Sequence, residues 1–271
     1  MGQVVHTLPR GLLIISVTSL DNEIFVLIWK GYEGDEVKVY DVITYRLQRC
    51  LTVPNARSVA DMTSCEHYHC LYISDDDDDL KCVHRLEVDG AGTQWPVNDE
   101  PSCLSVNAAH NVIVTCPCIH KIKEFSSHGD LLREFTLPDD VIYPWHTIQS
   151  HSGQFIVCHG GGNDPFHRVC MISADGRHIV HSHGGQRGSD IGLYNMPFHL
   201  AVDDNEFDYV ADVNNGRVTL LSPTLSYIRE VASTKKLKGY PHAMCLDVQR
   251  RRLYVIESDK WGKGSAVVFS V

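Results

Sequence analysis

The chain has no apolar run of the roughly 18 residues that a membrane-spanning helix needs, and its best apolar stretch, residues 12–17, has the length of one strand. The first residues also lack the basic start, the apolar stretch and the small-residue cleavage site of a secretory signal. No segment sustains the period of an amphipathic helix. With 43% hydrophobic residues and a mean hydropathy of −0.15, we expect a soluble globular protein with no membrane partner.

Several chemical signatures are missing as well. No nucleophile elbow, phosphate-binding loop or dinucleotide-binding fingerprint is present. The ten cysteines lack the paired spacing of a zinc module, and most fall inside apolar strand patterns. We therefore expect free thiols, no cofactor and a reducing, cytoplasmic location, while the pairs Cys65–Cys70 and Cys116–Cys118 stay open. A net charge of −10 argues against a surface devoted to nucleic acid, although a local basic patch remains compatible with it.

What the chain does contain is a repeat. A proline followed by an alternating apolar strand recurs at intervals of 43 to 53 residues, at Pro9, Pro54, Pro101, Pro144, Pro197 and Pro241. That interval is the length of one four-stranded propeller blade, and further β-branched and aromatic runs follow each proline. We predict an all-β fold, a six-bladed β-propeller of four-stranded antiparallel blades. Residues 1–271 form one domain, with repeats at 9–53, 54–100, 101–143, 144–196, 197–240 and 241–271.

The last repeat predicts how the ring closes. Only 30 residues follow Pro241, which is enough for three strands. An apolar stretch at residues 3–8 lies upstream of the first proline and belongs to no other blade. We expect this stretch to supply the outer strand of the last blade, because closure removes the exposed edges of an open ring.

Residues 185–190, 196–204 and 209–218 together resemble an NHL repeat, with a glycine-rich lead, a proline before an Ala-Val-Asp strand end, and a Val-Ala-Asp hairpin ending in Asn-Gly-Arg-Val. The other blades match in strand order and proline position. The resemblance is to the C-terminal propeller of tripartite-motif proteins, and it implies a loop-bearing face that binds RNA or protein. Related six-bladed rings, the peptidyl-amidating lyases and lactonase-like enzymes, hold metals at the channel. The chain contains no RING finger, B-box or coiled coil, so ligase activity does not reside in it.

Residues just after the repeat prolines are expected to enter the innermost strands near the mouth of the channel. The candidate ligand-binding residues there are Arg10, Trp145, His146, Phe198, His199 and His242. Three histidines with an open position would suit zinc, which makes His146, His199 and His242 the candidate metal ligands. His242 is one position out of register with the other two, however, and alternate strand residues point to opposite faces. We assign no catalytic residue.

Basic and acidic residues are expected on different blades. The basic ones, expected on the loop-bearing face of blades five and six, are Arg187, Arg217, Lys235, Lys236, Lys238, Lys260 and Lys263. The run at residues 75–79 lacks the spaced ligands of a calcium loop and is expected to be a solvated acidic loop. Together with Glu33, Asp35, Glu36, Asp139 and Asp140 it is expected to make the same face acidic across blades one to three. Five histidines of blade four, at 159, 167, 178, 181 and 183, show no metal-ligand spacing.

We expect a monomeric, non-enzymatic recognition module or scaffold that binds a protein or peptide on its loop-bearing face. One alternative is an RNA-binding NHL module that uses the basic patch, because phosphates require cations. Another is a metal-dependent, lyase- or lactonase-like enzyme with zinc or calcium at the channel. The RNA-binding alternative predicts that binding weakens steeply with salt, and the enzymatic alternative predicts that the purified protein contains metal.

Overall fold

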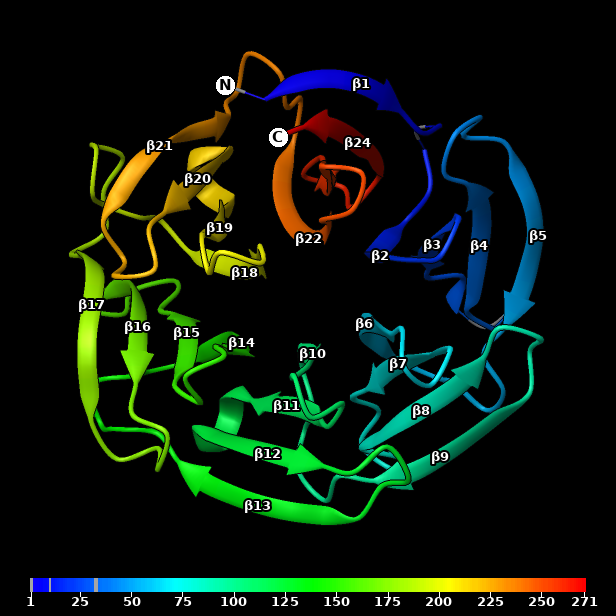
Figure 1. Ribbon diagram of the computed structural model, residues 1–271, viewed down its shortest axis with the longest axis horizontal. Coiled ribbons are helices and arrows are strands. Elements are labelled where there is room, and N and C mark those ends of the chain that lie inside the picture. The colour runs from blue at the N-terminus through cyan, green and yellow to red at the C-terminus, as the bar shows by residue number, and fades with distance from the viewer. Residues whose placement is uncertain (1, 10, 32–33) are drawn as a thin grey trace.

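Six four-stranded antiparallel sheets stand around a central channel (Figure 1). The computed structural model describes residues 2–9, 11–31 and 34–271. In each blade the first strand lies at the channel and the last at the rim. The prediction of a six-bladed all-β ring is confirmed, because runs of β-branched and aromatic residues between turn residues form strands here as expected.

The strands of the first three blades are β2 (Ile14–Leu20), β3 (Glu23–Ile28), β4 (Glu36–Asp41), β5 (Leu47–Thr52); β6 (Val59–Cys65), β7 (Cys70–Asp75), β8 (Cys82–Glu87), β9 (Gly92–Pro96); and β10 (Leu104–Val106), β11 (Val112–Cys116), β12 (Lys121–Phe125), β13 (Leu131–Thr136). Those of the last three are β14 (Pro144–Gln149), β15 (Phe155–His159), β16 (His167–Ile172), β17 (Ile179–Gly185); β18 (Pro197–Val202), β19 (Asp208–Asp212), β20 (Arg217–Leu221), β21 (Tyr227–Ala232); and β22 (Tyr240–Asp247), β23 (Arg252–Ser258), β24 (Gly264–Ser270), β1 (Gln3–Thr7). In the described part of the chain, the 3₁₀ turns η2 (Pro117–Ile119) and η3 (Val213–Asn215) connect β11 to β12 and β19 to β20. No helix among the described residues is long and apolar enough to cross a membrane.

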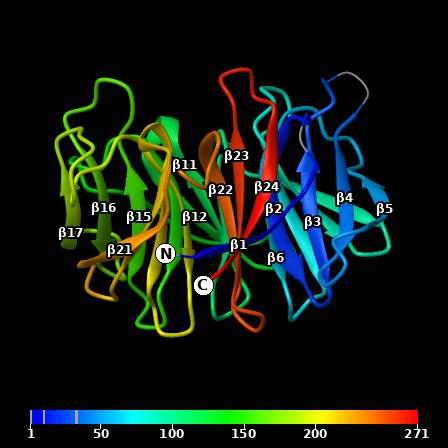
Figure 2. The ribbon, with the colours of Figure 1, turned by 90° about the horizontal axis from the view of Figure 1, so that it is seen from above.

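The antiparallel order sends the connections to two opposite faces of the ring (Figure 2). The loop-bearing face carries the connections between blades and those between the second and third strands of a blade. The turn-bearing face carries the hairpin turns that join the first to the second strand and the third to the fourth. Each innermost strand starts at the loop-bearing face and ends at the turn-bearing face.

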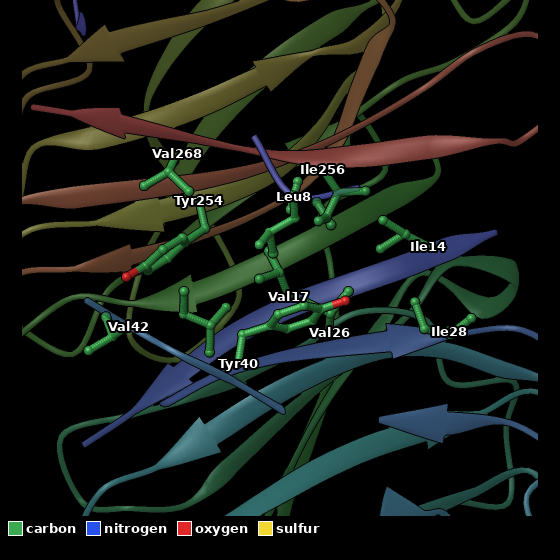
Figure 3. Close-up of a cluster of buried hydrophobic side chains, with 13 residues drawn as sticks. Leu8, Ile14, Val17, Val26, Ile28, Tyr40, Val42, Tyr254, Ile256 and Val268 are labelled. Atoms are coloured by element: carbon green, nitrogen blue, oxygen red, sulfur yellow. The ribbon is translucent and has the colours of Figure 1, made fainter. Parts of the chain in front are cut away.

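The N-terminal strand closes the ring as predicted. β1 pairs antiparallel with β24, with Val4 opposite Phe269 and Thr7 opposite Val267. The N–H of Leu8 continues this pairing by donating to the carbonyl oxygen of Ala266 at 2.9 Å. Leu8 is 2% exposed and packs with Tyr254 in the cluster shown in Figure 3. The last blade therefore contains both the N-terminal and the C-terminal strand.

The hydrophobic core is divided among the gaps between blades. Six clusters of buried side chains exist, and each draws its residues from two neighbouring blades. In the gap between blades six and one, Ile256 and Val268 meet Val17 and Val26 (Figure 3). Because each blade buries both of its faces against neighbours, the stability of the ring is distributed around its circumference.

The innermost strand of five blades contains a β-bulge at the same place. The residues just before the bulge are Ile14, Val59, Pro144, Pro197 and Pro241. The repeat proline thus lies in the inner strand in blades four to six, whereas in blades one and two β2 and β6 begin well after Pro9 and Pro54. Asn55, which follows Pro54, has a φ of 62° and lies away from the channel beside Gln94 of the outermost strand.

Blade five departs from the shared core pattern at Asp208. In the other blades the corresponding position of the second strand holds a fully buried apolar residue, and these are Ile24, Leu71, Val112, Phe155 and Leu253. Asp208 pairs with Val202 and Leu221 and is 2% exposed, and its Oδ1 has no hydrogen-bond partner. Burial, followed by the charges of Glu206 and Asp203, raises the pKa of Asp208 to about 8.

All ten cysteines are free thiols. Cys65 and Cys70 face each other in register across β6 and β7, and both are buried. Cys118 and Cys50 are exposed.

Candidate binding site in the central channel

A ring of side chains surrounds the channel at the position that follows the bulge. Its members, called the channel ring, are Ser16, Asp61, Cys103, His146, His199 and Ala243. In blade three, Cys103 is assigned to this position because its carbonyl oxygen accepts a hydrogen bond from the N–H of Thr115 in the neighbouring strand. Sequence reasoning found the two histidines and missed Ser16 and Asp61. Aligning blades one and two on the apolar residue before the bulge would have found both.

Asp61 is a buried carboxylate held from two sides. Its Oδ1 accepts a hydrogen bond from the Ser16 hydroxyl at 2.6 Å, and its Oδ2 accepts from the Leu104 N–H at 2.8 Å. Burial alone would raise its pKa, but the nearby His199 imidazole and the Ser16 hydroxyl lower the pKa of Asp61 below its usual value. The channel therefore contains a fixed negative charge at neutral pH.

His146 has both ring nitrogens engaged by backbone groups. Leu200 N–H donates to Nδ1 at 3.2 Å, so Nε2 carries the proton and donates to the Leu104 carbonyl oxygen at 3.0 Å. Burial, reinforced by repulsion from His199, lowers the pKa of His146 to about 3. His146 is thus a neutral structural histidine whose nitrogens are not free for a metal or a substrate proton.

His199 is the member of the ring with unused hydrogen-bonding capacity. It is 6% exposed, and neither ring nitrogen has a hydrogen-bond partner. Its ring stacks on that of His146 with centroids 4.0 Å apart and an interplanar angle of 15°. Its Nε2 lies 3.7 Å from Asp61 Oδ1, which is beyond a direct hydrogen bond. A ligand that reached His199 would find one donor and one acceptor nitrogen.

Two groups of described residues bring three potential metal ligands within 4.8 Å of one another. The first is Asp61, His146 and His199, so His242 does not join the other two predicted ligands. His242 instead lies with its Nε2 3.2 Å from the Ile14 carbonyl oxygen. The engaged nitrogens of His146 leave this group two usable side chains, fewer than the three protein ligands of a catalytic zinc site.

The second group, Asp75, Cys82 and His84, lies in blade two. His84 Nε2 is 3.1 Å from Asp75 Oδ2, and Asp75 accepts hydrogen bonds from the backbone N–H groups of Arg57 and Ser58. Burial raises the pKa of the Cys82 thiol to about 12, so the thiolate that zinc requires is disfavoured. The group holds the loop before β6 in place.

Three of the residues predicted at the mouth of the channel lie at the bulges of the innermost strands. Trp145, Phe198 and His242 occupy the bulge positions of β14, β18 and β22, one residue nearer the loop-bearing face than the channel ring. The rings of Trp145 and Phe198 are 5.0 Å apart, and Trp145 Nε1 donates to the Gly160 carbonyl oxygen at 3.2 Å. All three residues are half-buried. Arg10 lies outside the described residues.

The predicted basic patch contains residues with different roles. Exposed members on loops of the loop-bearing face are Arg187, Lys235, Lys238, Lys260 and Lys263. Lys236 donates to the Gly2 carbonyl oxygen beside the closing strand. Arg217 donates to Asp212 Oδ2 at 2.8 Å and to the carbonyl oxygens of Ser189 and Leu193 at 2.8 and 2.6 Å. Its guanidinium therefore fixes the connection between β17 and β18.

Part of the predicted acidic surface is also structural, which corrects the expectation of solvated loops. Asp75 and Asp35 are 0% and 1% exposed, and Asp35 accepts from the Lys30 N–H at 3.0 Å. A buried carboxylate that accepts backbone N–H groups holds a loop, as in blade two. Asp78 remains on the surface, and Glu33 lies outside the described residues. In blade four, His167 likewise accepts from the Met196 N–H at 2.9 Å.

Two hollows lie along the axis of the ring. The channel hollow, of about 240 Å³, is lined by His146, His199 and both apolar and hydroxyl-bearing residues below them on the innermost strands. A larger hollow of about 570 Å³ opens among the first hairpin turns on the turn-bearing face. The two share Ser64, Cys245 and Leu246 in their walls, so they adjoin each other. Trp145 and Phe198 line neither of them.

No family model and no curated protein matches the chain. Among solved structures, a catalytically inactive histidine-to-alanine variant of virginiamycin B lyase from Staphylococcus aureus with quinupristin has a TM-score of 0.65 at 13% identity, over 95% of this chain and 80% of that one. The Cps50 (Swd1) propeller domain from Myceliophteria thermophila has a TM-score of 0.62 at 10% identity, over 100% of both chains. A Bacteroides thetaiotaomicron protein of unknown function has a TM-score of 0.70 at 13% identity, over 99% and 72%. At these identities the similarity shows a β-propeller fold.

Proposed function

We propose that the protein is a recognition module that binds a protein or peptide on its loop-bearing face. The observation that carries the proposal is the placement of exposed aromatic side chains. Among the described Phe, Trp and Tyr residues, four are exposed, and all four lie on this face: Trp29, Tyr143, Tyr240 and Trp261, at 43%, 45%, 45% and 74% exposure. Aromatic side chains are enriched in protein interfaces and supply most of their anchors.

Trp29 and Trp261 flank the connection between blades six and one. Trp29 N–H donates to the Leu13 carbonyl oxygen at 2.9 Å, and a β-carbon added at Gly262, next to Trp261, would lie 3.0 Å from the Leu13 side chain. Both tryptophans therefore lie near Leu13, which brings exposed rings from blades six and one to the same connection. The Trp145–Phe198 pair adds a second apolar element at the mouth of the channel. The resemblance of blade five to NHL repeats supports the same face.

The channel ring also supports a binding function over an enzymatic one. Burial, followed by the charge of Asp61, raises the pKa of the Cys103 thiol well above its usual value, so it is a poor nucleophile. The Ser16 hydroxyl donates a hydrogen bond to Asp61, and no hydrogen bond joins it to an imidazole base among the described residues. His146 cannot act as a general base, because backbone groups engage both of its ring nitrogens.

A peptide-display selection tests the proposal. Immobilised wild-type protein and the variants Trp261→Ala and Trp29→Ala would each be panned against a phage-displayed peptide library. Ile43→Ala is the matched control, because Ile43 is 77% exposed but lies in a hairpin turn on the turn-bearing face. Peptides that bind the wild type and Ile43→Ala but lose about tenfold affinity with Trp261→Ala support the proposal. Peptides that bind all four proteins equally contradict it.

RNA is the second candidate partner, and the contact between Lys260 and Trp261 favours it. The Lys260 ammonium lies 5.1 Å from the centre of the Trp261 ring, and Lys235, Lys238 and Lys263 are exposed on the same face. Cations beside an exposed ring suit a stacked base and its phosphate. Binding of a random RNA pool should fall steeply with salt and with Lys235→Glu/Lys238→Glu. Absence of binding at low salt would exclude RNA.

A further inference from the structure

The turn-bearing face opens into a hollow of about 570 Å³. This hollow adjoins the channel hollow of about 240 Å³ at Ser64, Cys245 and Leu246, which line both. The channel hollow ends at the channel ring, where His146 and His199 line it. A ligand that entered from this face could therefore extend along the axis toward the ring without meeting the aromatic residues of the opposite mouth.

The rim of this hollow is strongly acidic. Its charged side chains are Asp21, Glu66, Asp204, Asp247 and Arg250. Arg250 is engaged within the rim, donating to Asp247 Oδ2 at 3.0 Å and to Asn22 Oδ1 at 2.6 Å. Glu66 and Asp204 are exposed. A low-dielectric cleft lined by charge of one sign concentrates ligands of the opposite sign, so the rim favours a cation.

The inner part of the hollow has a different character. Below the rim its wall has an apolar part, which includes Val106, Ile148 and Met244, beside the hydroxyl-bearing residues Thr18, Thr63 and Ser64. At its end lies His199, which is 6% exposed and has no hydrogen-bond partner on either nitrogen, with the Asp61 carboxylate 3.7 Å behind it. A buried imidazole without partners is costly unless something else satisfies it. The acidic rim, the partly apolar wall and the polar end follow one another along the axis.

We infer that this hollow binds a basic peptide by taking a lysine or arginine side chain into the channel. The methylene stem of such a side chain would lie along the apolar wall, and its charged end would donate a hydrogen bond to the acceptor nitrogen of His199 near Asp61. The carboxylates of the rim would contact neighbouring basic residues of the peptide. This site is on the face opposite the proposed aromatic surface and does not depend on it.

The test uses fluorescein-labelled, end-blocked Gly/Ser peptides that carry three arginines, three lysines or three glutamines, with binding followed by fluorescence anisotropy. The rim variant is Glu66→Gln/Asp204→Asn. Its matched control is Asp78→Asn/Asp79→Asn, which removes the same charge from exposed side chains on the loop-bearing face. His199→Phe keeps a ring against His146 and removes both nitrogens. Melting temperatures establish that each variant is folded.

Arginine or lysine peptides should bind the wild type more tightly than the glutamine peptide. The rim variant should weaken that binding about tenfold, since it removes two carboxylates, while the control changes it less than about twofold. His199→Phe should weaken it as well, because it removes the nitrogen that accepts the hydrogen bond. The inference is overturned if the three peptides bind alike, or if the control and the rim variant lose equal affinity. Trp261→Ala should leave this binding intact, which separates the two proposals.

Discussion

Removal of the closing strand should reveal how the ring is held shut. The variant lacks residues 2–7 and keeps Leu8. Most side chains of β1 are exposed, with Val4 and Val5 at 39% and 42%, so little apolar burial is lost with them. What disappears is the pairing of β1 with β24, which joins four residue pairs, and the bond from Gly2 N–H to the Val231 carbonyl oxygen.

The magnitude follows from those contacts. At about 0.5–1.5 kcal/mol for each backbone hydrogen bond, four or five bonds amount to about 2–7 kcal/mol. The stacking of His6 on Tyr45, with centroids 4.3 Å apart, adds a smaller contribution. A single-domain protein has about 5–15 kcal/mol of stability in all, so the loss is a large part of it. Leu8→Ala is the comparison: it removes a side chain that is 2% exposed and should cost about 2–5 kcal/mol by leaving a cavity.

Urea denaturation monitored by circular dichroism measures both effects. Native-state hydrogen exchange adds the location, because β24 should lose protection in the truncated protein while β10 to β13 keep theirs. A truncated protein whose unfolding free energy lies within about 0.5 kcal/mol of the wild type would refute the reasoning. Equal loss of protection in all six blades would show that the ring opens as one unit.

Three further predictions concern titration and a loop. The folded pKa of Asp208 is about 8, above the unfolded value of 3.8, so its contribution to stability is complete below pH 3.8 and declines as pH rises to 8. Asp208→Asn should remove a decline of up to about 1.4 kcal/mol per pH unit between pH 5 and 8, and parallel urea-denaturation profiles would contradict this. For His146, with a folded pKa of about 3 against 6.5, stability is present above pH 6.5 and is lost as pH falls, so His146→Gln should flatten the profile between pH 3 and 6.5. Arg217→Ala should destabilise the protein by about 3–5 kcal/mol, because it leaves the buried Asp212 carboxylate without its cationic partner, and should expose residues 186–196 to proteases. Unchanged proteolysis would contradict that last prediction.

Much of the fold could be predicted because strand patterns and turn residues are local. The interval between prolines predicted the number of blades, and the 30 residues after Pro241 predicted the closing strand. The position of the bulge could not be predicted in blades one and two, because Ile14 and Val59 replace the proline that marks it elsewhere. The consequence was that Asp61 was missed, although it is the charged member of the channel ring.

Other errors came from treating charge as a sign of exposure. Asp75 and Arg217 look like surface residues in the sequence, but each binds backbone groups of a neighbouring loop. Asp208 lies immediately before the Val-Ala-Asp hairpin of the NHL-like segment, and only comparison with the other blades shows that it occupies a core position. Burial depends on packing between blades, which spacing along the chain does not reveal.

The contacts of blade five show what the residues of its NHL-like segment do in the structure. Asn215 donates to Asp212 at 2.7 Å and to the Gly188 carbonyl oxygen at 2.9 Å, beside the bonds made by Arg217. The signature therefore consists of residues that clamp one connection, and ligand contacts are not part of it. Within this chain, the signature thus marks a connection that is held in place, and it leaves open what the exposed side chains of that connection contact.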